Sequence, residues 1–258
     1  MGLDGRVALV TGGNRGIGRG IALGLAADGA DIAVNYRRDV EGALATVADI
    51  EKLGRKAIAY QASVDQYDAV RDMVSQIVSD FGSIDILVNN AGIASRGQTV
   101  ADTDPAEFER VVRTHTFGAF YATREVIPHM RTRARGDIVM ISSAATRNFG
   151  PNGAPYNVGK AGIEALAQGV AKEELANGIR VNIVAPGIVE TEMGRRLMKA
   201  TRGVDDLRDI DSDAPFGQVC QPEDVANVVR YLVSDNNSYV TGERIYVDGL
   251  ASFLNSAR

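Results

Sequence analysis

Short apolar runs and amphipathic helical patterns alternate along the whole of this 258-residue chain. The runs are apolar on both faces, which is typical of strands in a buried parallel sheet. They are RVALVT from Arg6, DIAVN from Asp31, KAIAY from Lys56, IDILVN from Ile84, DIVMIS from Asp137, IRVNIVA from Ile179 and RIYVDG from Arg244. The alternation predicts an α/β fold, a doubly wound sheet of about seven parallel strands with helices on both faces.

The helical patterns between these runs predict one domain over residues 1–258, because no break in composition marks a boundary. In the clearest pattern, apolar residues recur at three- and four-residue spacing, which predicts a helix with one buried stripe. They are Val70, Met73, Val74, Ile77, Val78 and Phe81. From Glu190 to Gln218 the alternation lapses and aspartates gather. We expect either a substrate flap at about 190–218 or a solvated acidic loop there.

Composition excludes several classes of protein. The net charge of −5 argues against a nucleic-acid-binding protein, which needs a basic surface. No apolar stretch is long enough to span a membrane, so no membrane partner is expected. Cys220 is the only cysteine, which predicts a reducing, cytoplasmic location. One cysteine and two histidines are too few for a structural zinc site, and we expect no metal.

A glycine-rich turn follows the first predicted strand and precedes a helical pattern. Its sequence is TGGNRGIG, from Thr11 to Gly18. Glycines let the backbone turn sharply and approach a diphosphate, and the start of a helix offers free N–H groups. We therefore expect a dinucleotide here, the alternative being a glycine turn without a ligand. The expected cofactor-binding residues of the turn are Thr11, Gly12, Asn14, Arg15, Gly16, Ile17 and Gly18.

Tyr156 and Lys160 are four residues apart, which places them on one face of a helix. A phenol with a pKa near 10 is a poor base at neutral pH. A neighbouring ammonium group favours the phenolate, so we expect Lys160 to lower the pKa of Tyr156. Ser142 and Ser143 close the fifth predicted strand, and Ser143 lies 13 residues before Tyr156. The pattern indicates acid–base chemistry at the end of that strand.

The motifs together resemble the short-chain dehydrogenase/reductase family. They are TGxxxGxG after the first strand, NNAG at Asn89 to Gly92 after the fourth, and YxxxK at Tyr156 and Lys160. The resemblance covers nearly the whole chain and is to the short single-domain branch that includes the 3-oxoacyl-carrier-protein reductases. It implies a Rossmann-like fold and hydride transfer between a nicotinamide and a carbonyl or secondary alcohol. In this family Tyr156 would be the general acid, Ser143 would orient the carbonyl, and Lys160 would also bind the nicotinamide ribose.

The end of the second strand bears on the choice of cofactor. Tyr36 stands where NAD-dependent relatives carry an acid, and Arg37 and Arg38 follow it. Together with Arg15, these guanidinium groups favour a 2′-phosphate, hence NADP(H) over NAD(H). The alternative is that they begin a solvated helix. The resemblance adds the cofactor-binding candidates Asn35, Tyr36, Arg37, Ser63, Val64, Asn89, Ala91, Gly92, Pro186, Gly187, Val189 and Thr191.

Three of these candidates carry a qualification. Family members often have a pair that begins with Asp near the adenine amino group, and Ser63 and Val64 stand at that place here, so Ser63 would have to supply the contact. Asn89 has a purely structural alternative, because asparagines at strand ends often bond backbone groups.

The clearest departure from the family is His115, which stands three residues before Gly118. The family usually has a catalytic Asn at this place, holding a water that links the lysine to solvent. An imidazole both donates and accepts hydrogen bonds, so it could replace that link and titrate near its reference pKa of 6.5. The other interpretation is a histidine packed harmlessly between helix and sheet. Departure from the usual Asn could also change the activity near neutral pH or leave it low.

Substrate should enter outside the carboxyl ends of the strands. The candidate substrate-binding residues are Ser95, Ala145, Phe149, Met193 and Leu197. Met193 and Leu197, with Met198, form either an apolar lid or a cap on the core. The substrate stays open among a small-molecule or carrier-bound carbonyl, namely a 3-oxoacyl thioester, or a sugar, steroid or xenobiotic ketone.

Two questions about function and partners stay open, and the resemblance adds an expectation about the oligomeric state. The alternative to an enzyme is a dinucleotide-binding sensor or scaffold with little turnover. Arg131, Arg133 and Arg135 form a basic cluster that either docks an acidic carrier protein or is a solvated helix end. The resemblance implies a homo-oligomer, usually a homotetramer, with the tail IYVDGLASFL packing across an interface.

Overall fold

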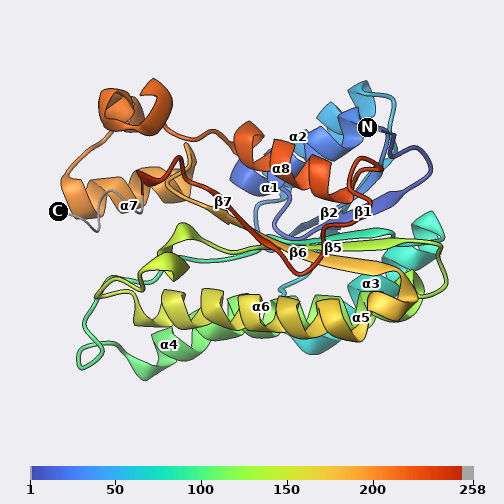
Figure 1. The fold of residues 1–258 in the computed structure, drawn as a ribbon, viewed down its shortest axis with the longest axis horizontal. Coiled ribbons are helices and arrows are strands. Elements are labelled where there is room, and N and C mark those ends of the chain that lie inside the picture. Colours follow the sequence, from blue (N-terminus) through green and yellow to red (C-terminus); the bar gives the residue numbers. More distant parts are fainter. Residues whose placement is uncertain (1, 252–258) are drawn as a thin grey trace.

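A computed structural model describes residues 2–251. Within this range, seven strands form one parallel sheet in the order β3-β2-β1-β4-β5-β6-β7 (Figure 1). The strands are β1 (Val7–Val10), β2 (Asp31–Tyr36), β3 (Ala57–Gln61), β4 (Ile86–Asn89), β5 (Gly136–Ile141), β6 (Ile179–Pro186) and β7 (Arg244–Val247). Each contains residues of one predicted run, so the predicted doubly wound fold is confirmed. The strand order reverses between β1 and β4, and open α/β sheets bind ligands at the carboxyl ends of the strands at such a reversal.

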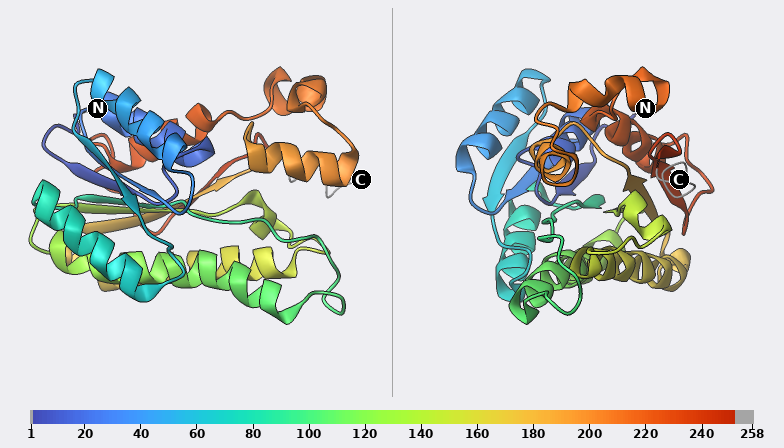
Figure 2. Two further views of the ribbon diagram at one scale, coloured as in Figure 1. Left: turned by 180° about the vertical axis from the view of Figure 1, so that it is seen from behind. Right: turned by 90° about the vertical axis from the view of Figure 1, so that its left-hand side faces the viewer.

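Helices cover both faces of the sheet. Helices α1, α2 and α8 lie on one face, and α3, α4, α5 and α6 lie on the other (Figures 1 and 2). The helices are α1 (Gly16–Ala27), α2 (Val40–Lys52), α3 (Tyr67–Phe81), α4 (Pro105–Val112), α5 (Gly118–Met130), α6 (Ala154–Glu173), α7 (Glu192–Arg202) and α8 (Pro222–Val233). Short helices are η1 (Arg113–Phe117), η2 (Ala144–Arg147), η3 (Leu175–Asn177), η4 (Leu207–Asp213) and η5 (Pro215–Gly217).

The sheet separates two apolar cores. Ile21 of α1 and Val229 of α8 belong to the first core, and both are fully buried. The predicted stripe of α3 belongs to the second, where Val70 and Ile77 are also fully buried. Alternate strand residues enter the two cores, which explains why the strands are apolar on both faces.

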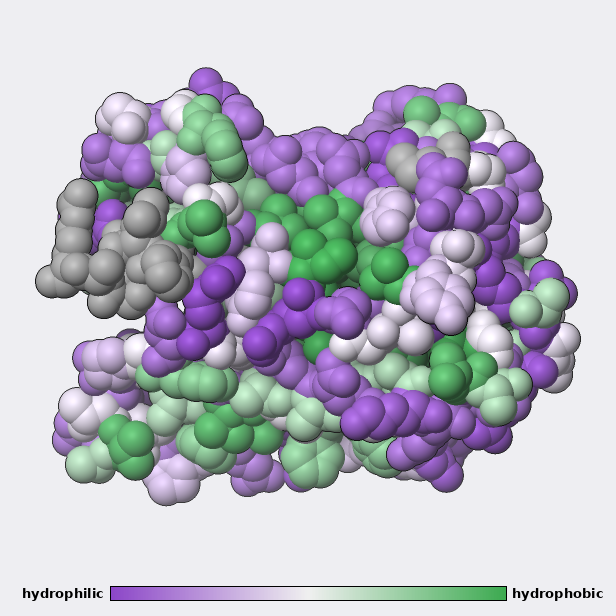
Figure 3. Space-filling view, viewed as in Figure 1, coloured by the Kyte–Doolittle hydropathy of each residue, from purple (hydrophilic) through white to green (hydrophobic). Residues whose placement is uncertain are grey.

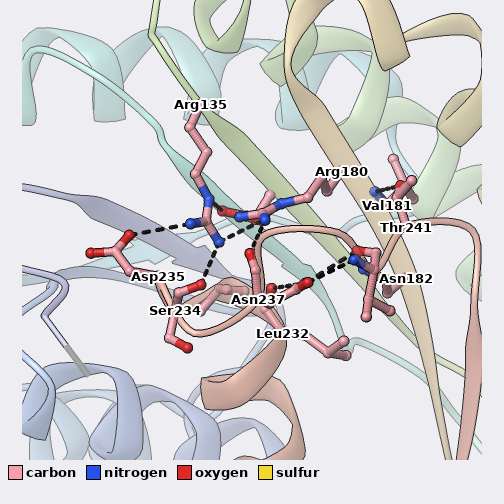
Figure 4. Close-up of polar contacts among 12 residues, drawn as sticks. Arg135, Arg180, Val181, Asn182, Leu232, Ser234, Asp235, Asn237 and Thr241 are labelled. Atoms are coloured by element: carbon pink, nitrogen blue, oxygen red, sulfur yellow. Dashed lines mark hydrogen bonds and ion pairs between the residues drawn. The ribbon is translucent and has the colours of Figure 1, made fainter.

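A polar network fastens the segment before β7 to the amino ends of β5 and β6 (Figure 4). Arg180 donates to the carbonyl oxygen of Asn237, and Arg135 donates to that of Ser234 at 2.8 Å. Asn182 donates to the carbonyl oxygen of Val240 at 3.0 Å. These bonds satisfy backbone groups that would otherwise be buried without partners, and they fix β7 as the last strand.

The basic cluster that we considered for carrier docking lies at this same amino edge. Arg131 pairs with Glu174 at 2.5 Å, Arg133 with Asp85 at 2.7 Å, and Arg135 with Asp137. Within one chain, the cluster is therefore at the opposite end of β5 from Ser143, and its charges are paired internally.

The segment after β6 leaves the sheet and forms α7, η4 and η5. These elements have a small apolar cluster of their own, in which Met198, Leu207 and Val219 are buried. The end of the predicted interface tail, from residue 252, lies outside the described residues. No helix among residues 2–251 has the length and apolar character needed to cross a membrane.

Candidate active site

The glycine turn lies at the carboxyl ends of β1 and β4, where the strand order reverses. Gly12 and Gly16 have φ values of 62° and 53°, in the left-handed region that favours glycine. A Cβ atom on Gly18 would lie 2.2 Å from the carbonyl oxygen of Gly12, so position 18 excludes any side chain. The tight turn inferred from the sequence is therefore present.

Asn90 holds this turn, although the sequence analysis did not single it out. Its Nδ2 donates to the carbonyl oxygens of Thr11 at 2.9 Å and Gly12 at 3.2 Å. The hydroxyl of Thr11 in turn accepts from the backbone N–H groups of Asn90 and Ala91 at 2.9 and 3.0 Å. The NNAG motif carried the signal, but spacing alone did not show which of its two asparagines faces the turn.

The start of α1 fits an anionic ligand. Arg15 precedes the helix and makes no side-chain cap hydrogen bond, so its first N–H groups are not capped by that residue. A Cβ atom on Gly16 would lie 3.2 Å from Cγ2 of Thr191, which places Thr191 beside the turn. A glycine cradle against uncapped helix donors is the arrangement that a dinucleotide diphosphate requires.

Charged side chains border the end of β2. Arg37 and Arg38 are exposed, and neither has an ion-pair partner within residues 2–251. Arg15 pairs with Glu192 at the start of α7, at 2.7 Å. Tyr36, by contrast, is 8% exposed and packs in the first core. Two unpaired guanidinium groups therefore lie at the end of this strand.

Several other predicted cofactor residues make contacts within the protein. Asn35 accepts from the N–H of Gly12 at 3.2 Å, Asn14 donates to Asp39 at 2.9 Å, and Ser63 donates to Asp65 at 2.6 Å. The amide of Asn89 donates to Thr123 at 3.1 Å, which agrees with its structural alternative. Contact of these side chains with a dinucleotide stays a prediction. Ile17 lies in the first turn of α1, Pro186 is the last residue of β6, and Val64, Gly92, Gly187 and Val189 lie in segments that follow β3, β4 and β6.

Ser143, Tyr156 and Lys160 come together at the carboxyl end of β5. Ser143 is the N-cap residue of η2, and its side chain hydrogen-bonds Tyr156 near the start of α6. Lys160 lies one turn further along α6 and is 4% exposed. Its Nζ donates to the carbonyl oxygen of Ile141 at 2.7 Å and lies 5.6 Å from the centre of the Tyr156 ring. The helix thus fixes both side chains against the end of one strand.

Burial sets the protonation of this group. It lowers the pKa of Lys160 to about 7, opposed by the charge of Glu164. It raises the pKa of the Tyr156 phenol, and the hydrogen bond from Ser143 opposes the rise. The predicted lowering of the Tyr156 pKa by Lys160 is therefore wrong for this structure, because desolvation of the phenolate outweighs other effects. The Tyr156 phenol is therefore protonated at neutral pH.

His115 lies in η1, a turn of π-helix between α4 and α5, and is 2% exposed. Its Nε2 lies 2.8 Å from the carbonyl oxygen of Ile93 and 3.3 Å from the backbone nitrogen of the same residue. Its Nδ1 is buried without a hydrogen-bond partner among the described residues. Burial and the charge of Lys160 lower the pKa of His115 to about 3, so the prediction that it titrates near neutral pH is wrong.

The candidate substrate residues surround the same end of the sheet. Phe149 follows η2 and is 54% exposed, whereas Met193 and Leu197 on α7 are 42% and 45% exposed. Met198 instead packs in the small cluster of the segment after β6. Ser95 and Ala145 are partly exposed, in the loop after β4 and in η2. Of the three lid candidates, one caps a core and two stay accessible.

Comparisons with known proteins agree with this geometry. The sequence model of a family described as enoyl-(acyl carrier protein) reductase matches residues 12–249. The 3-oxoacyl-acyl-carrier-protein reductase FabG of Staphylococcus epidermidis is 38% identical over 243 residues, which cover 94% of this chain and 97% of that protein. Versicolorin reductase of Emericella nidulans is 38% identical over 255 residues, 96% of each chain.

Solved structures show the same likeness. A short-chain dehydrogenase from Burkholderia cenocepacia in complex with NADP has a TM-score of 0.86 at 37% identity, covering 96% of this chain and 98% of that one. A parallel sheet with a glycine turn at the reversal of strand order, beside a Ser, Tyr and Lys group, defines a class of nicotinamide-dependent oxidoreductases. Within that class, the chain belongs to the short-chain dehydrogenase/reductase family. It is similar to the 3-oxoacyl-acyl-carrier-protein reductases of that family.

Proposed function

We propose that the protein is an NADP(H)-dependent oxidoreductase that interconverts a carbonyl compound and a secondary alcohol. The observation that carries this proposal is the convergence of Ser143, Tyr156 and Lys160 at the carboxyl end of β5, the strand next to β4, where the strand order reverses. The nicotinamide supplies or accepts the hydride when it is bound. The residues of the chain position the substrate and move the proton.

In the reducing direction, Tyr156 gives its phenolic proton to the carbonyl oxygen, and in the oxidising direction it takes the proton back. Because Ser143 and Tyr156 are hydrogen-bonded to each other, both hydroxyls can reach one substrate oxygen. Ser143 then orients the carbonyl and stabilises charge that develops on its oxygen. Lys160 uses one donor on Ile141, which leaves two donors for a ribose hydroxyl and for the charge near Tyr156.

The proposed cofactor is NADP(H) in preference to NAD(H). The glycine turn, the start of α1 and Thr191 would hold the diphosphate. Arg37 and Arg38 would bind the 2′-phosphate, because guanidinium groups match phosphate in charge and geometry. The NADP complex of the Burkholderia cenocepacia relative supports this choice.

The proposed substrate is a 3-oxoacyl thioester, with segment 190–218 as its flap. Phe149, Met193 and Leu197 expose apolar side chains that suit an acyl chain. The reductase of Staphylococcus epidermidis, whose name gives a 3-oxoacyl substrate on a carrier protein, supports this class. Sugar, steroid or xenobiotic ketones are the alternative substrates, and a sensor or scaffold with little turnover is the alternative function.

We further propose that the protein forms a homo-oligomer, and specifically a homotetramer. Phe108, Phe117 and Phe120 on α4, η1 and α5 are 37%, 44% and 45% exposed. Hydrophobic residues also gather along the layer of α4 and α6 (Figure 3). Such a surface is costly to leave in water and suits a symmetric interface. A particle of the 27.4 kDa monomer mass in solution would contradict this proposal.

A cytoplasmic location stays a prediction that rests on the single cysteine.

The experiment is oxidation of NADPH, followed by absorbance, with an acetoacetyl thioester as substrate. We expect turnover with NADPH that exceeds turnover with NADH. If NADPH binds without turnover, a panel of sugar, steroid and xenobiotic ketones decides between another carbonyl substrate and a binding protein. Absence of both binding and turnover would contradict the proposal.

A further inference from the structure

Helix α6 presents three polar residues, one per turn, to the end of β5. Tyr156 and Lys160 belong to the site described above. The third is Glu164, whose Oε1 accepts a hydrogen bond from Oγ of Ser142 at 2.5 Å. Because these residues are spaced four apart, they lie on one face of the helix. The stripe that carries Tyr156 and Lys160 therefore continues to a buried carboxylate.

Glu164 also contacts η2, on the other side of Ser143. The hydroxyl of Thr146 lies 2.7 Å from Oε1 of Glu164 and 2.8 Å from the carbonyl oxygen of Ser143. Ser142 and Thr146 are each 3% exposed, so water does not compete for these bonds. One carboxylate oxygen thus ties together the residue before Ser143 and the residue three positions after it.

The second carboxylate oxygen faces another element. Oε2 of Glu164 pairs with Arg244 on β7 at 2.5 Å. The side chain of Glu164 is 11% exposed and that of Arg244 is 40% exposed. A buried carboxylate is costly unless it is paired and hydrogen-bonded, and Glu164 has both kinds of partner. The pair with Arg244 connects α6 to β7 next to the site.

We propose that Glu164 is a positioning residue of this site, which fixes the two segments that flank Ser143 and supplies a negative charge one helical turn from Lys160. This inference rests on the proposed function. Glu164 touches neither Tyr156 nor Ser143 by a side-chain hydrogen bond, so it acts through Ser142, Thr146 and the charge of Lys160.

Charged and titratable groups around Lys160 determine the direction in which its pKa shifts when Glu164 or Arg244 is replaced. Tyr156 and Glu164 face it from α6, and His115 faces it from η1. Burial lowers the pKa of Lys160 to about 7, and the charge of Glu164 opposes that fall. Removing the charge should lower the pKa of Lys160 further. Removing Arg244, which offsets the charge of Glu164, should raise it.

The direct test is a titration of Lys160 by NMR of carbon-labelled lysine side chains in the full-length protein. The chain has five lysines, and Lys160→Met identifies the signal. We expect Glu164→Gln to lower the pKa of Lys160 by roughly one unit, and Arg244→Met to raise it. The matched control is Glu173→Gln, an exposed glutamate at the end of the same helix, which should leave the titration unchanged.

Kinetics gives the second readout. In the reducing direction, the basic limb of the pH profile of kcat should move to lower pH in Glu164→Gln and to higher pH in Arg244→Met. Ser142→Ala should lower kcat and leave the Lys160 titration in place, because it removes a support of Ser143 and no charge. A protein in which Glu164 only stabilises the fold would lose stability without these opposed shifts.

The outcomes separate this inference from the proposed function. Opposed shifts of the Lys160 titration support the role of Glu164, even if no carbonyl substrate is turned over and the reductase proposal fails. If Glu164→Gln does not fold, Arg244→Met still tests whether the Lys160 pKa shifts in the expected direction. An unchanged Lys160 titration in the folded variants would overturn the inference, whatever the activity of the enzyme.

Discussion

The imidazole of His115 meets the ring of Tyr156 edge to face, with ring centres 5.3 Å apart and planes at 82°. This geometry is favourable for aromatic pairs and places the histidine directly behind the proposed proton donor. Glycines on both sides make room for it. A Cβ atom would lie 2.5 Å from Cε1 of His115 at position 92 and 3.1 Å from its Cβ at position 159. His115 is thus part of the packing that holds Tyr156.

Replacement of His115 by Asn should change how stability depends on pH. The pKa of His115 is lowered from 6.5 to about 3 in the folded protein, so below pH 6.5 the unfolded chain binds a proton that the folded chain does not. As the pH decreases from 6.5 to 3, the contribution of His115 to the free energy of unfolding therefore decreases, by about 1.4 kcal/mol per pH unit. Urea unfolding at several pH values should show that the difference in the free energy of unfolding between the parent and His115→Asn changes with pH by this amount. The difference between the parent and His129→Asn, at the only other histidine, should not show this change.

Gly92→Ala should destabilise the protein through His115. The new methyl group would overlap the imidazole, which costs about 1–3 kcal/mol in a packed site. In a His115→Ala background most of that cost should disappear, which a double-mutant cycle on the free energy of unfolding measures. Gly150→Ala, where a Cβ atom meets nothing within 4 Å, is the control. Additive effects of the Gly92 and His115 changes would contradict this account.

Asn90→Ala should weaken binding of NADPH and NADH to a similar extent. The substitution removes two hydrogen bonds that hold the glycine turn, and neither bond senses the 2′-phosphate. We expect roughly a tenfold rise in both dissociation constants and a loss of about 1–3 kcal/mol of stability. Asn227→Ala, at an exposed asparagine of α8, is the matched control and should leave both dissociation constants unchanged. Parent-like cofactor affinity in Asn90→Ala would show that the turn does not need this amide.

Arg37→Ala should discriminate between the two cofactors. A guanidinium–phosphate contact contributes about 1.5–3 kcal/mol, so kcat/KM for NADPH should fall roughly tenfold or more. The value for NADH should change less than about twofold, since no phosphate would lie beside Arg37. Arg71→Ala, at an exposed arginine of α3, is the matched control. Equal losses with both cofactors would contradict NADP(H) selection by Arg37.

The fold could be predicted because its signals are local. Each strand is a short apolar run, and the stripe of α3 is complete within 15 residues. The glycine turn was equally visible, because Gly12 and Gly16 adopt conformations that other residues avoid. The spacing of Tyr156 and Lys160 predicted that they share one helix face, and both residues lie in the 20-residue helix α6.

The remaining features depend on contacts between distant parts of the chain. Asn90 reaches a turn about 80 residues away, and Glu164 meets Arg244 across 80 positions. Burial reversed the expected shift of the Tyr156 pKa, because spacing shows that Lys160 lies near Tyr156 but not how little water reaches either group. The same holds for His115, whose low pKa follows from its complete enclosure.

The central claim is that Tyr156 is the proton donor of a hydride-transfer site. The most direct measurement compares Tyr156→Phe with Tyr239→Phe, at a tyrosine that is 96% exposed, in oxidation of NADPH by an acetoacetyl thioester. NADPH binding, measured by calorimetry, should be retained in both. We predict that Tyr156→Phe loses at least roughly 100-fold in kcat and that Tyr239→Phe keeps the parent rate. Parent-like turnover in Tyr156→Phe would contradict the account.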